Sequence, residues 1–155
     1  ISITVERLAG YKRALAEAGM QIPDDYIKYC AHGGRDINEI ENAVNDLLLH
    51  QDKPDAILTT SDRITTTTLY LLNKLGVKIP GEIALVGYTN TTLADVLNPS
   101  LSSIYQPGFE MGQKATEMLL SLILSKRPVY EFEKLVLPTQ LFVRQSTSPK
   151  SCSSA

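Results

Sequence analysis

The 155-residue sequence predicts an α/β fold, an open parallel sheet flanked by helices. Segments with helical hydrophobic periodicity alternate with short apolar segments along the chain. Residues 83–87 form a nearly continuous apolar run, which is typical of a central parallel strand that is buried on both faces. Parallel strands joined by helices require right-handed crossovers, and these place the helices against the faces of the sheet.

The first 60 residues predict a helix over 5–19, a strand over 26–30, a helix over about 37–50 and a strand over 56–59. The first helix has one apolar face and ends at Gly19, since glycine commonly terminates helices. Asp36 is predicted to cap the second helix, and Glu39 completes a capping box. The second helix is expected to bury Ile37, Ile40, Val44 and Leu47 or Leu48.

The rest of the chain predicts a helix over about 62–75, strands over 83–87 and 101–105, a helix over about 108–125, and strands over 134–137 and 140–144. Ser61 or Asp62 caps the third helix, which ends at Gly76. Gln106 and a proline open the long fourth helix. The tail 148–155 is rich in serine and is expected to be disordered.

The composition argues against several classes of function. The formal net charge is −2 and the 15 Lys and Arg residues are scattered, so these residues alone are not expected to bind nucleic acid. No apolar run approaches the roughly 20 residues of a membrane span, and the first residues lack a signal-peptide pattern. The cysteines and histidines lack metal-ligand spacing. We therefore expect a cytoplasmic protein without a metal, a cofactor or a membrane partner.

Polar side chains follow several predicted strands. In an open parallel sheet, ligands bind beyond the carboxyl ends of the strands. Residues 32–35, 60–62 and 88–90 satisfy that rule and offer hydroxyls, amides, one carboxylate and the guanidinium group of Arg35. A polyhydroxylated ligand needs donors and acceptors of these kinds together.

Each of these positions also has a plainer interpretation. Ser61 and Asp62 are explained by helix capping, and Asp62 is expected to act only as a cap. Packing explains Tyr88, and an exposed surface position explains Arg7 and Arg35. The sequence contains no GxSxG nucleophile elbow and no cysteine with an evident histidine partner, so catalysis is not expected.

Five segments, taken in order, resemble the LacI/GalR family of transcriptional repressors. They are RLAGYKRAL (7–15), PDAILTTSD (54–62), LGVKIPGEIALVGY (75–88), NPSLSSIYQPGFEMGQKA (98–115) and LPTQLFVRQS (137–146). One such motif is weak evidence, but five in the family's order and spacing are strong. The resemblance covers about residues 5–147.

The resemblance implies a type I periplasmic-binding-protein-like sensor built from two subdomains. Residues 1–147 would form a partial effector-binding and dimerisation domain, namely the C-terminal subdomain plus the crossover helix. The helix-turn-helix, the first subdomain and the first strand of the second are expected to be missing, so DNA would be contacted only through the missing N-terminal domain. The implied partners are a small-molecule carbohydrate effector and a second copy in a homodimer. Residues 106–125 would be the crossover helix, which returns to the first subdomain. Without that subdomain as its packing partner, the helix would expose an apolar face.

The resemblance also assigns roles to single residues. Arg7 matches the family arginine that binds effector hydroxyls or carboxylates, and Ser61 takes the place of a ligand-contacting Asn or Ser. Gln106 matches a residue that lines the cleft at the crossover. Arg35 stands roughly where many members have an aromatic residue that stacks on the sugar.

One motif departs from the family pattern. The family commonly has GYDD or GFDD, whose first aspartate holds ligand hydroxyls, whereas this chain has GYTN, with Thr89 in that place and Asn90 after it. A neutral side chain there leaves Arg7 and Arg35 able to grip a carboxylate bidentately. We therefore hypothesise an anionic sugar as the effector, with Thr89 and Asn90 among its contacts.

Two other functions compete with the regulator. A sugar-binding protein of a transport system shares the fold, and the repressor-like segments 80–88 and 138–144 argue against it. An α/β enzyme ranks third, since no nucleophile or cofactor motif supports it. A helix-turn-helix or an export signal encoded upstream would decide between the first two.

Overall fold

The computed structural model describes residues 2–21, 23–125 and 133–148. Its centre is a four-stranded sheet in the order β1-β2-β3-β4. β1 (Ala56–Thr59), β2 (Ala84–Tyr88) and β3 (Ser102–Tyr105) run parallel, and β4 (Gln140–Phe142) is antiparallel to β3. The predicted central strand is confirmed, because β2 pairs on both sides. The sheet is mixed where an open parallel sheet was expected.

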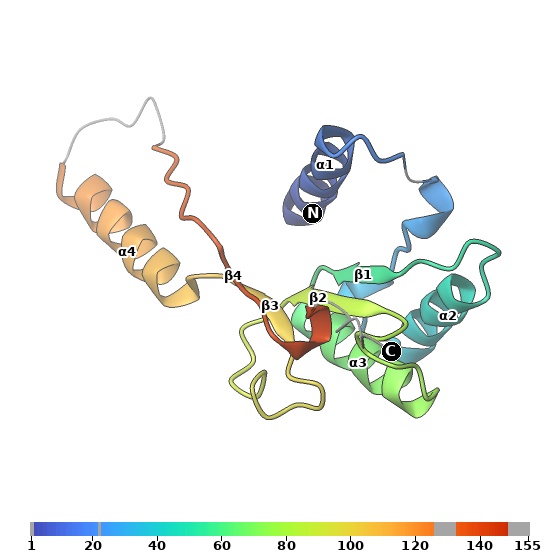
Figure 1. Cartoon of the computed structure of the whole chain (residues 1–155). Helices are drawn as coiled ribbons and strands as arrows, with labels where there is room; N and C mark the ends of the chain where they lie inside the picture. The colour runs from blue at the N-terminus through green and yellow to red at the C-terminus, as the bar shows by residue number, and fades with distance from the viewer. Residues whose placement is uncertain (1, 22, 126–132, 149–155) are drawn as a thin grey trace.

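Helices lie on both sides of this sheet, but of the described α-helices only α2 (Ile37–Leu48) and α3 (Asp62–Lys74) pack closely against it. These two lie together on one face, and α1 (Ser2–Glu17) lies over the other (Figure 1). The main core lies between α2, α3 and the sheet. Its buried apolar side chains include Ile40, Val44, Leu47, Leu69, Leu72, Ile57, Leu85 and Leu101.

Two predicted strands are wrong. Residues 26–30 form no strand in the described chain: a 3₁₀ turn, η1 (Asp24–Tyr26), precedes extended but unpaired backbone. A cavity of about 740 Å³ separates this backbone from β1. Residues 134–137 are also unpaired, because they lie beyond the point where β4 leaves β3. High β-propensity does not make a strand where no partner edge is within reach.

The second helix shows which capping details were right. Asp36 is its N-cap and accepts a hydrogen bond from the Asn38 backbone N–H at 2.9 Å. The predicted capping box is wrong, since the Glu39 carboxylate instead accepts from the Ala31 N–H at 2.8 Å and holds the preceding turn. Ile37, the first residue of the helix, is 49% exposed and not buried as predicted.

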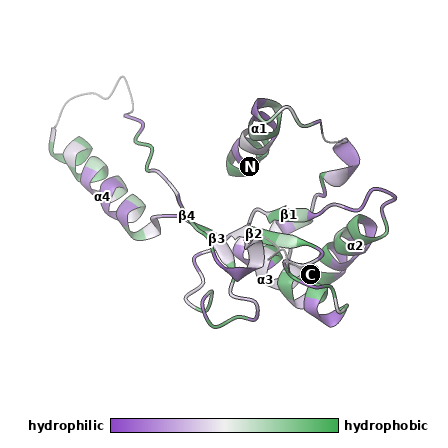
Figure 2. Ribbon diagram, in the orientation of Figure 1, coloured by the Kyte–Doolittle hydropathy of each residue, from purple (hydrophilic) through white to green (hydrophobic). Residues whose placement is uncertain are grey.

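The fourth helix, α4 (Gly108–Ser125), stands away from the sheet (Figure 1). Hydrophobic residues lie along it without a covering element (Figure 2), and no described α4 side chain is buried. Phe109 is 83% exposed and Leu124 is 75% exposed. The expected exposed apolar face of this segment is therefore present. None of the described helices combines the length and hydropathy needed to cross a membrane. The tail predicted to be disordered is 148–155, and all of it except Ser148 lies outside the described part of the chain.

Candidate functional site

The candidate site lies at the carboxyl ends of the three parallel strands. β1 ends at Thr59, β2 at Tyr88 and β3 at Tyr105, and polar residues follow each of them. The parallel pairing of β1 with β2 and of β2 with β3 brings these ends to one edge of the sheet. Such an edge is where open α/β sheets bind ligands.

Arg7 connects α1 to this edge. Its guanidinium group donates to the backbone carbonyl of Thr60, directly after β1, and to the Gln106 side-chain oxygen at 2.5 Å, directly after β3. The same group lies over the Tyr88 ring, 4.4 Å from its centroid, which is a cation–π contact. One side chain thus contacts the ends of all three strands. The Arg7 donors already bond to two oxygen acceptors of the chain. The oxygens of a ligand could take the place of these acceptors.

Asn90 joins two strand ends through a pair of hydrogen bonds. Its amide nitrogen donates to the Gln106 carbonyl at 2.6 Å, and its amide oxygen accepts from the Gln106 N–H at 2.9 Å. Its own backbone N–H donates to the Asp62 carboxylate at 3.1 Å. The segments after β1, β2 and β3 are therefore tied together by side chains. A ligand would meet a preorganised polar edge, which lowers the entropic cost of binding.

Ser61 is the N-cap of α3, yet its side chain makes no capping bond. Its hydroxyl oxygen is shielded from solvent and has no hydrogen-bond partner within the described chain. A buried polar atom without a partner costs about 1–3 kcal/mol. Ser61 follows Thr60, whose carbonyl Arg7 binds, and it lies at the N-terminus of a 13-residue helix. Both features favour a ligand that carries oxygen atoms.

Two predicted site residues lie differently from the others. Thr89 is 2% exposed, and its hydroxyl accepts a hydrogen bond from the Thr91 N–H at 3.1 Å, which fixes the turn after β2. Arg35 is exposed in the turn before α2 and has no hydrogen bond or ion pair with another described residue. The structure thus brings Arg7, Asn90 and Gln106 together. Ser61 lies next to the Thr60 carbonyl that Arg7 binds, while the Thr89 side chain is buried.

The sequence reasoning missed two members of this network. Asp62 was expected to be only a helix cap, but its carboxylate holds the loop after β2 through Asn90. Tyr88 had packing as its plain explanation, but its ring faces the Arg7 guanidinium. Tyr88 ends β2 and Asp62 lies three residues after the end of β1, so the rule on strand ends could have indicated both.

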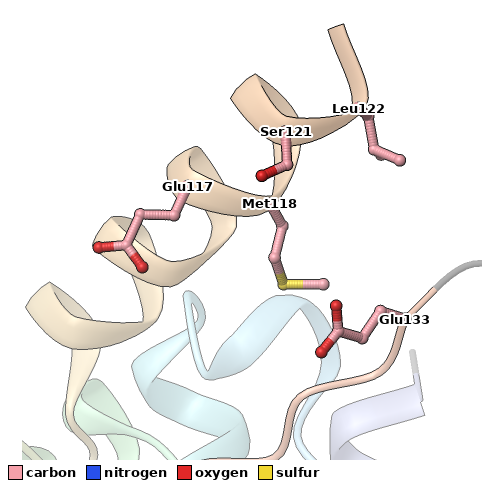
Figure 3. A pocket seen from close by; sticks show the side chains of 5 residues that line it. All are labelled: Glu117, Met118, Ser121, Leu122 and Glu133. Carbon is pink, nitrogen blue, oxygen red and sulfur yellow. The ribbon is translucent and has the colours of Figure 1, made fainter. Parts of the chain in front are cut away.

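Two cavities are lined by described residues, and the larger one reaches the candidate site at Arg7 and Thr60. The cavity of about 740 Å³ lies between α1, α2 and the outer edge of β1, and its lining is largely apolar. A smaller one of about 240 Å³ lies between α4 and residue 133, where Met118 and Glu133 point toward each other (Figure 3). The smaller cavity is lined by α4 and by residue 133, and none of the candidate site residues lines it.

Residues 2–147 match the sequence model of the periplasmic binding protein-like domain. The HTH-type transcriptional repressor PurR of Vibrio campbellii is 32% identical over 135 residues, which are 87% of this chain and 38% of that protein. The ribose operon repressor of Escherichia coli is 32% identical over 90% of this chain and 41% of its own length. This chain thus spans about two fifths of the length of these relatives.

Solved structures give the same result. The transcriptional regulator CelR in complex with cellobiose superposes with a TM-score of 0.79 at 33% identity, over 92% of this chain and 42% of that one. A LacI regulator from Bacillus cereus subsp. cytotoxis superposes with a TM-score of 0.81 at 27% identity, over 94% and 50% of the two chains. The predicted periplasmic-binding-protein-like fold is confirmed.

Proposed function

The chain belongs to the periplasmic binding protein-like domain family, among the LacI/GalR-type regulators, and from this premise we propose that it forms one wall of an effector site in a transcriptional regulator. The effector is a small carbohydrate-like molecule. The observation that supports this best is the Arg7 side chain, which contacts the ends of all three parallel strands.

The ligand contacts we propose are Arg7, Ser61 and Gln106, with Asn90 holding the edge in shape. Arg7 and Gln106 present donors and an acceptor side by side, as sugar hydroxyls require. Ser61 adds a hydroxyl that has no partner among the described residues. Two similar proteins carry carbohydrate words in their own names, one a ribose operon repressor and one a cellobiose complex, which supports the same ligand class here.

Within that class, an anionic sugar derivative is our specific hypothesis. Thr89 gives the turn after β2 a neutral side chain, and its hydroxyl is occupied by the Thr91 N–H. The Asp62 carboxylate accepts from the Asn90 N–H, so one of its acceptor positions is already occupied. The Arg7 guanidinium has the fork geometry that matches a carboxylate, which would replace its present partners, the Thr60 carbonyl and the Gln106 side chain.

Calorimetric titration separates the neutral and anionic alternatives. The longest natural polypeptide that contains these residues would be titrated with neutral sugars and, pair by pair, with their uronates. We expect tighter binding of the uronate in at least one pair. Preference for the neutral member in every pair that binds would refute the anionic hypothesis while leaving the carbohydrate class intact. Because this chain supplies one wall of the site, the 155-residue protein alone should show no measurable sugar-dependent rise in Tm.

Control of transcription follows from a two-state switch. An effector that binds one relative orientation of two subdomains more tightly shifts the population toward it. DNA would then be contacted by a helix-turn-helix outside these residues, in a homodimer. The exposed apolar face of α4 supports a further packing partner in the complete assembly. Effector-dependent operator affinity of the complete protein, measured by fluorescence anisotropy, tests this switch, and operator binding that is indifferent to the effector would exclude it.

A further inference from the structure

A cluster of side chains far from the strand ends ties two loops together. His50 lies after α2, and its Nε2 is 2.9 Å from the Asp25 carboxylate in η1. Its Nδ1 is 3.2 Å from the Asp52 backbone carbonyl oxygen. The Tyr26 ring packs against the imidazole with 4.7 Å between centroids, and the Tyr26 hydroxyl donates to the same carbonyl. The loop before α2 is thus fastened to the loop before β1.

The two oxygen partners of His50 favour the protonated ring. An imidazolium donates one hydrogen bond from each nitrogen, to the Asp25 carboxylate and to the Asp52 carbonyl, whereas a neutral ring donates only one. The neutral ring can instead accept from the Asp52 N–H, which is also 3.2 Å from Nδ1. Deprotonation therefore leaves the ring in place, with Nε2–H still donating to the Asp25 carboxylate, but removes the ionic part of that attraction.

The charged groups around the cluster are mainly acidic. The carboxylates of Asp25 and Asp52 both act on His50, and Lys28 acts on Asp25. The Lys28 ammonium is itself paired with Asp46 of α2 at 3.3 Å. The hydrogen bond with Asp25 raises the pKa of His50, and the bond with His50 lowers the pKa of Asp25. Charge and hydrogen-bond geometry therefore both favour the protonated form of His50.

We propose that His50 is a proton-linked clasp that fastens the connection between α1 and α2 and thereby steadies α1. Lys12 of α1 pairs with Asp24 of η1 at 3.0 Å, so a fixed η1 also restrains the helix. The other attachment of α1 to the sheet edge is the Arg7 contact with Thr60 and Gln106. Acidification from neutral pH tightens the clasp.

The pH window follows from the sign of each shift. His50 has a raised pKa, so its contribution is complete below the ordinary histidine value of 6.5 and is lost as pH rises through the raised value. Asp25 has a lowered pKa, so its contribution is complete above the ordinary value of 3.8 and is lost as pH falls through the lowered value. The clasp is therefore strongest between those two ordinary values.

Two measurements on the 155-residue protein test the clasp. The chain has two histidines, so NMR titration of the imidazole carbons follows His50 with His32 as internal reference. We expect Asp25→Asn to lower the His50 midpoint, because the variant loses the carboxylate that faces Nε2. An unchanged His50 midpoint would overturn the proposal.

Hydrogen exchange supplies the second readout. After correction for intrinsic rates, amides of residues 24–30 should gain about twofold protection or more from pH 7.5 to pH 5.5, as a surface ion pair allows. Asp25→Asn and His50→Gln should abolish this gain. Arg7→Ala should retain it, which separates the clasp from the proposed effector site. Equal protection at both pH values in the wild type, or a gain that survives in His50→Gln, would refute the clasp.

Discussion

Replacing Gly87 by alanine places a methyl group where the structure has no room for one. The new Cβ would lie 2.3 Å from the Thr65 methyl carbon and 2.4 Å from each of the Thr59 and Thr65 hydroxyl oxygens. Carbon contacts are optimal at about 3.5–4.0 Å. Both threonines are buried and their hydroxyls are 2.7 Å apart in a hydrogen bond, so neither can move aside without breaking it.

The expected cost of Gly87→Ala is about 3 kcal/mol, the upper part of the range for overpacked cores. For a chain of this size, that corresponds to a fall in Tm of roughly 6–12 °C. Urea denaturation followed by circular dichroism measures the free energy of unfolding directly. The matched control is Gly10→Ala, since nothing lies within 4 Å of the new Cβ there. In the middle of α1 that change should stabilise by about 0.5–1 kcal/mol.

A double variant tests the assigned cause. Thr65→Ala removes two of the three atoms that the new methyl group would meet. The cost of Gly87→Ala should therefore be smaller by about 1 kcal/mol or more in the Thr65→Ala background. A Gly87→Ala protein with a free energy of unfolding within about 0.5 kcal/mol of wild type would refute the packing described for β2 and α3.

Two further predictions concern the junction of β3 and β4. The Ser146 hydroxyl donates to the Leu85 carbonyl at 2.6 Å and accepts from the Ser102 N–H at 2.8 Å. Ser146→Ala should therefore lower the free energy of unfolding by about 1–3 kcal/mol in urea denaturation. A change near zero would mean that these groups find other partners. The Arg144 side chain is 18% exposed and binds the exposed Asp95 carboxylate at 2.5 Å as well as buried oxygens. Arg144→Met should therefore destabilise more than Asp95→Ala in the same assay, and the reverse order would contradict this.

The parallel part of the fold was predictable because its signals are local. An apolar run at 83–87 and helical periodicity around it place a central strand between two crossovers. The strand expected over 26–30 does not form, and the local sequence could not have shown this. A strand exists only with a partner edge, and here a cavity lies between that backbone and β1.

The candidate site was predictable as a place but only partly as a set of contacts. The rule on strand ends locates Ser61, Asn90 and Gln106, since it needs only the order of the elements. It cannot say that Thr89 is buried in a turn or that Asp62 reaches across to the next loop. The burial of Thr89 and the Asp62 contact depend on where these side chains point, which is fixed only when the strands pair.

The most direct test of the effector site compares two arginines of α1 in the complete natural protein. Arg7 binds the strand ends, whereas Arg13 is an exposed residue whose side chain is 78% accessible. Calorimetry should show effector affinity about 30-fold weaker in Arg7→Ala, corresponding to roughly 2 kcal/mol, and unchanged in Arg13→Ala. Thermal melting of both variants checks that the fold is retained. Wild-type affinity in a folded Arg7→Ala protein would contradict the proposal that the strand ends bind the effector.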